Sequence, residues 1–136
     1  MNIKKLNEEL EKFLLKEDLY AIADPEDEDS WKSKGSGDQQ GPIFGSKSAA
    51  SKYKKEHGLK GKIYDVDFGF LIDDIADFSY EVEEDTGIAQ KDFLLPKNKQ
   101  KIYNAYKKYL HRQDSMYNLD TIKKDDFWWC VDQAIG

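Results

Sequence analysis

The residues best placed to do chemistry lie in one acidic segment, between Asp65 and Asp92. This segment contains ten carboxylates and a single lysine. Carboxylates at this density can hold a divalent cation, present negative charge to a basic partner, or remain as an ordinary solvated surface. The spacing of the residues around them helps to separate these three roles.

The acidic segment has the periodicity of an amphipathic helix. Its apolar residues recur at intervals of three and four, so they share one helical face: Phe68, Leu71, Ile72, Ile75, Phe78 and Val82. At about 100° per residue, six carboxylates fall on the opposite face. They are Asp73, Asp74, Asp77, Glu81, Glu84 and Asp85. The resulting stripe is roughly 18 Å long at about 1.5 Å of rise per residue.

Such a stripe has two interpretations. It can imitate a phosphate backbone and dock in a groove, lined with Lys and Arg, that otherwise binds nucleic acid. It can also be a solvated face that keeps the protein soluble. A second acidic run, within the sequence DPEDEDS, would add a flexible anionic segment to the first interpretation. Its residues are Glu26, Asp27, Glu28 and Asp29.

A metal site is the alternative that would make the protein an enzyme. Oxygen ligands for Mg²⁺ would come from Asp65, Asp67, Asp73, Asp74 and Asp77, as in a small metal-dependent nuclease. The chain has no Glu-x-Lys sequence of the kind such nucleases use, and no EF-hand loop. We therefore expect no catalytic residues, no bound metal and no cofactor, with the metal-dependent nuclease as the alternative.

The other reactive residue types have structural explanations. His57 and His111 lack the Cys or Asp spacing of a zinc site. Cys130 lies in the apolar sequence Trp-Trp-Cys-Val and is expected in the core. A single cysteine excludes an internal disulfide and fits a reducing compartment.

Charge is strongly segregated along the 136 residues, which carry a net charge of −6. Residues 46–62 contain six lysines and one glutamate, and residues 97–112 contain six cations and no acid. The alternating blocks could neutralise one another in the fold. The charged N-terminus is unlike a signal peptide, and the chain has no apolar run of membrane-spanning length. These features predict a cytoplasmic protein without membrane or small-molecule partners.

The patterns predict a mostly α domain of about five helices and allow a short β element near residues 62–68; α+β is the alternative fold class. Helices are expected at residues 2–17, 47–57, 68–86, 96–112 and 120–134. The expected helix boundaries include Ser46, Asp67 and Asp120 as N-caps, Pro96 in the first turn, and Gly87 as a C-terminal stop. Tyr103, Tyr106 and Tyr109 are expected in the core.

The predicted organisation is an N-terminal helical segment at residues 1–31, a linker at 32–45 and a helical body at 46–136, in one compact domain. The stripe from Ile3 to Leu14 must dock on the body or on a partner. A monomer or a weak dimer is expected, and an adaptor that dimerises through this stripe is a further alternative.

The opening sequence MNIKKLNEELEKFLLK resembles the leader helix of many small proteins carried by phages and integrative elements of low-GC Gram-positive bacteria. The short, acidic, aromatic-rich chain with one dense carboxylate ridge is similar in character to their anti-CRISPR proteins, several of which act on type II effector nucleases. The resemblance implies a stoichiometric inhibitor in a bacterial host cytoplasm. The expected partner is a basic nucleic-acid-binding protein, a CRISPR effector nuclease or its guide-RNA complex. An immunity protein that neutralises a basic toxin nuclease is the alternative of the same physical class.

Overall fold

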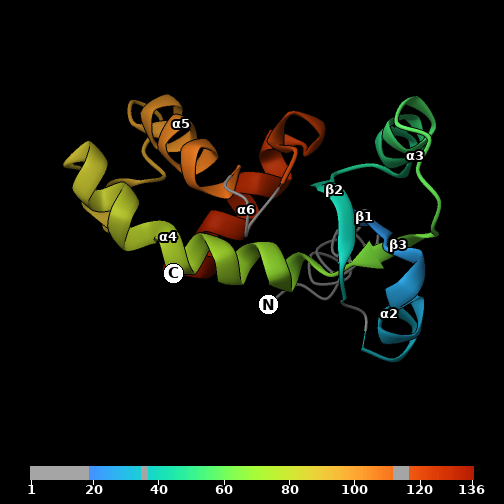
Figure 1. The fold of residues 1–136 in the computed structure, drawn as a ribbon. Helices are drawn as coiled ribbons and strands as arrows, with labels where there is room; N and C mark the ends of the chain where they lie inside the picture. Colours follow the sequence, from blue (N-terminus) through green and yellow to red (C-terminus); the bar gives the residue numbers. More distant parts are fainter. Residues whose placement is uncertain (1–18, 35–36, 112–116) are drawn as a thin grey trace, which may run out of the picture.

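The computed structural model describes residues 19–34, 37–111 and 117–136, which form a small sheet at one end and a layer of helices at the other (Figure 1). The strands are β1 (Leu19–Ala23), β2 (Gln39–Phe44) and β3 (Ile63–Val66). The helices are α2 (Glu28–Lys34), α3 (Lys47–Glu56), α4 (Phe68–Thr86), α5 (Lys99–Leu110) and α6 (Lys124–Ile135). Short 3-10 turns lie at Pro25–Asp27, Gln90–Asp92 and Leu119–Thr121. The prediction of a mostly α protein with a short β element is confirmed.

The sheet is antiparallel in the order β2-β1-β3, so β1 is its central strand. Alternate residues of β1 face two cores: Leu19, Ala21 and Ala23 join the main core, whereas Ile22 packs in a small cluster beneath α3. The strand predicted near residues 62–68 is β3. Strands β1 and β2 were not predicted from the sequence.

Strand β2 corrects the prediction of a linker at residues 32–45. The range contains several glycines and Pro42, which disfavour a strand, but a proline is tolerated on an edge strand, and β2 pairs with β1 along one side only. Helix α2 also extends into this range. The division of the chain into three segments otherwise stays a prediction.

The acidic run at the start of α2 is also more ordered than predicted. The Asp24 side chain accepts a hydrogen bond from the Glu26 amide, which caps the 3-10 turn. Trp31 is buried, stacks on Tyr64 with ring centroids 5.7 Å apart, and donates from Nε1 to the Asp38 carbonyl. A buried tryptophan one turn behind the acids therefore holds them in a folded segment.

The predicted ends of the acidic helix are confirmed in α4. The Asp67 carboxylate accepts a hydrogen bond of 2.7 Å from the Gly69 amide, and Gly87 ends the helix in the left-handed conformation at φ 69°. Helices α5 and α6 pack on the same side of α4 (Figure 1). Their shared core is aromatic, with Phe127 lying 5.1 Å from Tyr103 and 5.9 Å from Tyr106 between ring centroids.

Two predicted helix starts are wrong. Pro96 lies in a turn, and α5 begins at Lys99, because the Asn98 side chain donates to the Asp92 carbonyl and ties that turn down. Asp120 does not cap α6; it lies in a 3-10 turn and pairs with Lys107, and Ile122 is buried in extended backbone before α6 begins at Lys124.

Several core predictions are confirmed. Tyr103, Tyr106 and Tyr109 are buried in α5, and Cys130 is buried in α6. The predicted helix at residues 2–17 lies outside the described residues. Within the part of the chain that the structure describes, no helix combines the length and the apolar character that a membrane span requires.

Candidate functional site

The side of α4 away from α5 and α6 is the main candidate site. None of the described helices or strands packs over it in Figure 1. Five exposed residues follow this side at intervals of three, four, three and four: Phe70, Asp73, Asp77, Tyr80 and Glu84. We call these five residues the acidic face. Phe70 and Tyr80 are 43% and 62% exposed, so two aromatic rings interrupt the carboxylates.

Two of the six predicted carboxylates border the acidic face and are hydrogen-bonded within the protein. The Tyr117 hydroxyl donates to Asp74 over 2.5 Å, and the Tyr109 hydroxyl donates to Asp85 over 2.5 Å. Lys108 Nζ lies 3.5 Å from the same oxygen of Asp85. Asp74 and Asp85 therefore link α4 to the helical layer instead of standing free.

The electrostatics of this border follow from burial and crowding. Partial burial raises the pKa of Asp74, and the negative charges of Asp77 and Asp73 add to the rise, whereas the hydrogen bond from Tyr117 opposes it. Burial also raises the pKa of Tyr117, and its hydrogen bond to Asp74 raises it further. Tyr117 thus remains a neutral donor at neutral pH.

Glu81 and Glu84 differ although both were predicted on the stripe. Glu81 is half-buried, and its Oε2 is enclosed with no hydrogen-bond partner among the described residues. Glu84 is exposed, and its hydrogen bond with Tyr80, one turn earlier, is the main cause that raises the pKa of the Tyr80 hydroxyl. Glu84 therefore belongs to the acidic face, and Glu81 lies beneath its surface.

The second predicted set of acids lies elsewhere, at the start of α2 beside the sheet (Figure 1). Asp27 accepts a hydrogen bond from the Asp38 amide over 2.5 Å, and Glu28 accepts one from the Lys62 amide over 3.2 Å. Glu26 and Asp29 are exposed. The structure therefore does not combine the two acidic sets on one helix.

The described residues contain no group of three or more His, Cys, Asp or Glu side chains arranged to hold a metal ion. Of the predicted Mg²⁺ ligands, Asp67 is engaged as the cap of α4 and Asp65 is exposed on β3. The five carboxylates predicted as Mg²⁺ ligands therefore do not surround a common point in the structure.

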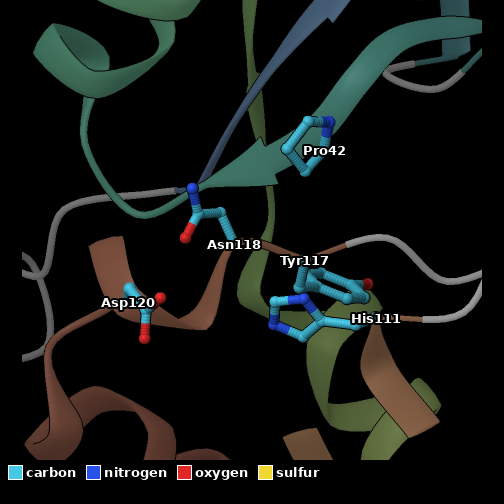
Figure 2. Close-up of a pocket in the computed structure, with 5 residues that line it drawn as sticks. All are labelled: Pro42, His111, Tyr117, Asn118 and Asp120. Carbon is cyan, nitrogen blue, oxygen red and sulfur yellow. The ribbon is translucent and has the colours of Figure 1, made fainter. Parts of the chain in front are cut away.

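A hollow of about 270 Å³ lies between β2 and the segment that leads into α6 (Figure 2). Pro42, His111, Tyr117, Asn118 and Asp120 line it, with the rings of His111 and Tyr117 side by side. The side chains of Tyr117 and Asp120 have partners within the protein, Asp74 and Lys107.

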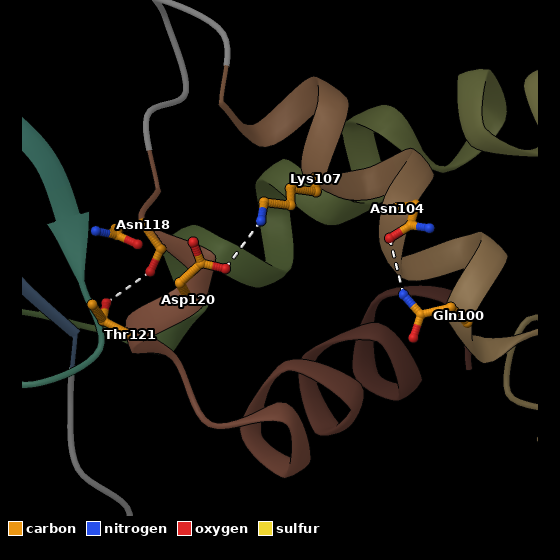
Figure 3. A network of polar contacts seen from close by, with 6 residues as sticks. All are labelled: Gln100, Asn104, Lys107, Asn118, Asp120 and Thr121. Atoms are coloured by element: carbon orange, nitrogen blue, oxygen red, sulfur yellow. Dashed lines mark hydrogen bonds and ion pairs between the residues drawn. The ribbon is translucent and has the colours of Figure 1, made fainter.

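Contacts within the protein fix the polar groups near this hollow (Figure 3). Lys107 Nζ lies 3.0 Å from Asp120, and the Thr121 hydroxyl donates to the Asn118 carbonyl over 2.7 Å. On the same face of α5 as Lys107, Gln100 donates to Asn104 over 3.0 Å. The Lys107–Asp120 and Thr121–Asn118 contacts stabilise the connection between α5 and α6.

Sequence reasoning missed the aromatic part of the site. Phe70 and Tyr80 share the helical face with the acids, so a helical wheel of all residues would have found them. Tyr109 was predicted in the core because its ring falls on the apolar face of its helix. Nothing in the sequence indicated that its hydroxyl reaches Asp85. Tyr117 gives no signal, because 43 positions separate it from Asp74.

The fold and the site together define a small, mostly helical protein whose longest described helix presents an acidic outer face with exposed aromatic rings. Comparison with models of protein families, with curated proteins and with solved structures gave no match.

Proposed function

We propose that the protein inhibits a nucleic-acid-handling protein by binding its basic groove through the acidic face of α4. The observation that carries the proposal is the exposure of Asp73, Asp77 and Glu84 on the uncovered side of the helix. None of these three carboxylates forms an ion pair with a described residue. Their negative charge is therefore available to a partner.

The helix gives these charges a fixed geometry. Asp73 and Asp77 are one turn apart, about 5–6 Å, and Glu84 follows two turns later. A rigid helix loses little conformational entropy when it binds, whereas a flexible nucleic-acid strand must order its backbone. Fixed carboxylates can therefore replace phosphates in a groove lined with Lys and Arg.

The exposed rings favour an arginine-rich partner surface. Phe70 and Tyr80 lie among the carboxylates, so a guanidinium group that approaches a carboxylate also meets an aromatic face. Arginine pairs with carboxylates through two hydrogen bonds and stacks on aromatic rings. Stacking of arginine on these rings adds affinity that an ordinary solvated surface without aromatic side chains would not offer.

The first candidate partner is a type II CRISPR effector nuclease in a bacterial cytoplasm, because the N-terminal segment resembles proteins of phages and mobile elements. A basic toxin nuclease, neutralised by an immunity protein, is the alternative that the same face supports. In both cases Asp74 and Asp85 contribute at the border of the acidic face, Glu81 adds negative charge from beneath it, and Glu26 to Asp29 contribute a separate contact.

The test is inhibition of target cleavage by a purified type II effector loaded with its guide RNA. The triple variant Asp73→Lys, Asp77→Lys, Glu84→Lys should lose inhibition by about 100-fold or more, because close charge pairs at an interface contribute more than 1 kcal/mol each. A matched control reverses three exposed carboxylates elsewhere: Glu56→Lys, Asp65→Lys and Asp132→Lys.

The control should inhibit like the wild type, and both variants should keep the wild-type circular dichroism spectrum and melting temperature. Inhibition by the wild type should also weaken steeply as salt increases. Unchanged inhibition by the face variant would exclude the acidic face as the contact. If the wild type does not inhibit the effector, a pull-down from host lysate at low and high salt is the next test. Capture of a basic toxin nuclease at low salt would support the alternative, and capture of no basic protein would contradict both.

A further inference from the structure

Helix α3 makes a second charged surface, opposite in sign to the acidic face. It lies over the sheet at one end of the molecule, whereas α4 runs from the sheet toward the other end (Figure 1). Lys47, Lys52 and Lys55 are exposed and fall within an arc of about 140° at 100° per residue. Lys60 and Lys62, both exposed, extend this surface into the connection to β3.

The charge of these lysines is not neutralised by the acidic blocks. Among the described residues their one ion pair is Lys52 with Glu56, at 3.9 Å between two exposed side chains. A pair this long and exposed contributes little. Glu28 contacts Lys62 through the backbone amide of that residue, and Lys62 is exposed and forms no ion pair with Glu28. The basic block at 46–62 therefore keeps its charge for an outside partner.

A stacked aromatic pair lies at the C-terminal end of α3, where the helix leads into the connection that carries Lys60 and Lys62. The exposed ring of His57 stacks on Tyr53 with centroids 4.0 Å apart, and its Nδ1 lies 3.0 Å from the Tyr53 carbonyl oxygen. Tyr53 in turn packs on Phe44, with centroids 5.3 Å apart. A Cβ atom at Gly41 would lie 2.5 Å from the Tyr53 ring, so the glycine is needed for this close fit. The His57 side chain is exposed at the end of α3.

We propose that α3 and the following connection bind single-stranded nucleic acid, with the lysines on the phosphates and His57 stacked on a base. Proteins that bind single strands combine a positively charged track with rings that stack on bases. The net charge of −6 does not oppose this locally, because at physiological ionic strength charges separated by more than about 8 Å are largely screened. The proposal is independent of the function proposed for α4.

The test is fluorescence anisotropy of a labelled single-stranded oligouridylate titrated with the full chain, from about 50 mM to about 200 mM salt. The triple variant Lys47→Ala, Lys52→Ala, Lys55→Ala should bind at least about tenfold more weakly. Its slope of log affinity against log salt should fall by about 2, since three phosphate contacts contribute roughly 0.7 each on single strands. His57→Ala should weaken binding by about five- to tenfold without changing that slope.

The matched control removes three exposed lysines near the N-terminal ends of α5 and α6: Lys97→Ala, Lys101→Ala and Lys123→Ala. It should bind the oligonucleotide like the wild type, and melting temperatures should confirm that every variant is folded. Failure of the wild type to bind at low salt would overturn the proposal, as would equal weakening by the two lysine triples. Binding to vesicles containing phosphatidylserine, with no binding to the oligonucleotide, would assign α3 to a lipid surface instead.

The two proposals fail in separate experiments. The variant Asp73→Lys, Asp77→Lys, Glu84→Lys should retain oligonucleotide binding even though it loses inhibition of the nuclease. If that variant lost binding of the oligonucleotide, α3 would not be the contact surface and the proposal for α3 would be wrong.

Discussion

Helices α3 and α4 are both amphipathic, but they are integrated into the protein to different degrees. Helix α4 is covered on one side by α5 and α6, and its bordering carboxylates receive hydrogen bonds from Tyr109 and Tyr117. Helix α3 rests on the sheet through a small cluster, and its lysines extend into solvent. The comparison shows that charge segregated along the sequence stays segregated in the fold.

The carboxylates that border the acidic face, Asp74 and Asp85, accept hydrogen bonds from neutral tyrosine hydroxyls, and this explains why the region keeps its negative charge. A lysine beside Asp74 would cancel the negative charge, whereas the neutral Tyr117 hydroxyl satisfies an oxygen and leaves the charge in place. Lys108 is a partial exception at Asp85, but that pair is exposed and screened. The helical layer therefore holds α4 in position without neutralising it.

The largest expected effect is on the free energy of unfolding, when a buried aromatic residue is removed from the core beneath α4 or from the cluster beneath α3. Phe127→Ala, in the aromatic core under α4, should lower the free energy of unfolding by about 3–5 kcal/mol, because the surrounding rings cannot fill the cavity. Phe44→Ala, in the cluster beneath α3, should lie at the low end of this range. Urea denaturation measures both.

Amide hydrogen exchange sharpens this comparison. Phe44→Ala should speed exchange in α3 more than in α4, because α3 depends on few buried residues. If Phe44→Ala opened the amides of α4 and α3 equally, the two regions would unfold as one unit and the contrast between them would be wrong.

The next effect tests the tyrosine border. Tyr117→Phe removes the hydroxyl that donates to Asp74 and should destabilise the protein by about 1 kcal/mol, since Asp74 is partly solvated and can recover water. The pKa of Asp74 should also rise, because this hydrogen bond favours the ionised form. NMR titration of the Asp74 side chain measures the shift.

Tyr80→Phe is the matched control for Tyr117→Phe. Its hydroxyl is hydrogen-bonded to a carboxylate of α4 as well, but it is exposed, so the urea denaturation midpoint should stay close to that of the wild type. Equal losses in the two variants would show that the border tyrosines hold α4 no more firmly than the surface tyrosine does.

The sequence predicted what depends on local spacing. The ends of α4 followed from Asp67 and Gly87, and its buried side from residues such as Leu71 and Ile75, because capping and helical periodicity act within a few residues. The buried ring of Tyr106 followed in the same way.

The sequence could not predict what depends on distant pairing. Strand β1 is stabilised by partners about twenty and about forty residues away, and β2 is irregular enough to resemble a linker. The bond from Tyr117 to Asp74 likewise exists only because the fold brings the two segments together. The aromatic part of the acidic face was visible in the sequence, but counting carboxylates alone concealed it.

A smaller effect comes from the pH dependence of stability at the border of α4. The folded pKa of Asp74 lies above the ordinary value of 3.8, so its ionisation disfavours the folded state as pH rises through that folded pKa. Asp74→Asn should therefore gain stability relative to the wild type between about pH 4 and neutrality and show no such gain at lower pH. The gain should stay below about 1 kcal/mol because the side chain is half-exposed.

Denaturation curves across this pH range measure the gain. In the Tyr117→Phe background the same substitution should give a larger gain, because the hydrogen bond no longer lowers the pKa of Asp74. A gain that grows toward acid pH instead would mean that Asp74 stabilises the fold when ionised, contrary to the crowding by Asp73 and Asp77.

The smallest expected effect is the change in the free energy of unfolding when lysines of α3 are removed. It tests whether these lysines contribute to binding or to folding. The variant Lys47→Ala, Lys52→Ala, Lys55→Ala should change the free energy of unfolding by less than about 0.5 kcal/mol. Alanine's higher helix propensity offsets the loss of the weak Lys52–Glu56 pair and of a cation near the helix C-terminus. A loss above about 1 kcal/mol would show that these lysines stabilise the fold itself. A neutral result, together with weaker oligonucleotide binding, would mean that the charge of α3 contributes to binding and not to folding.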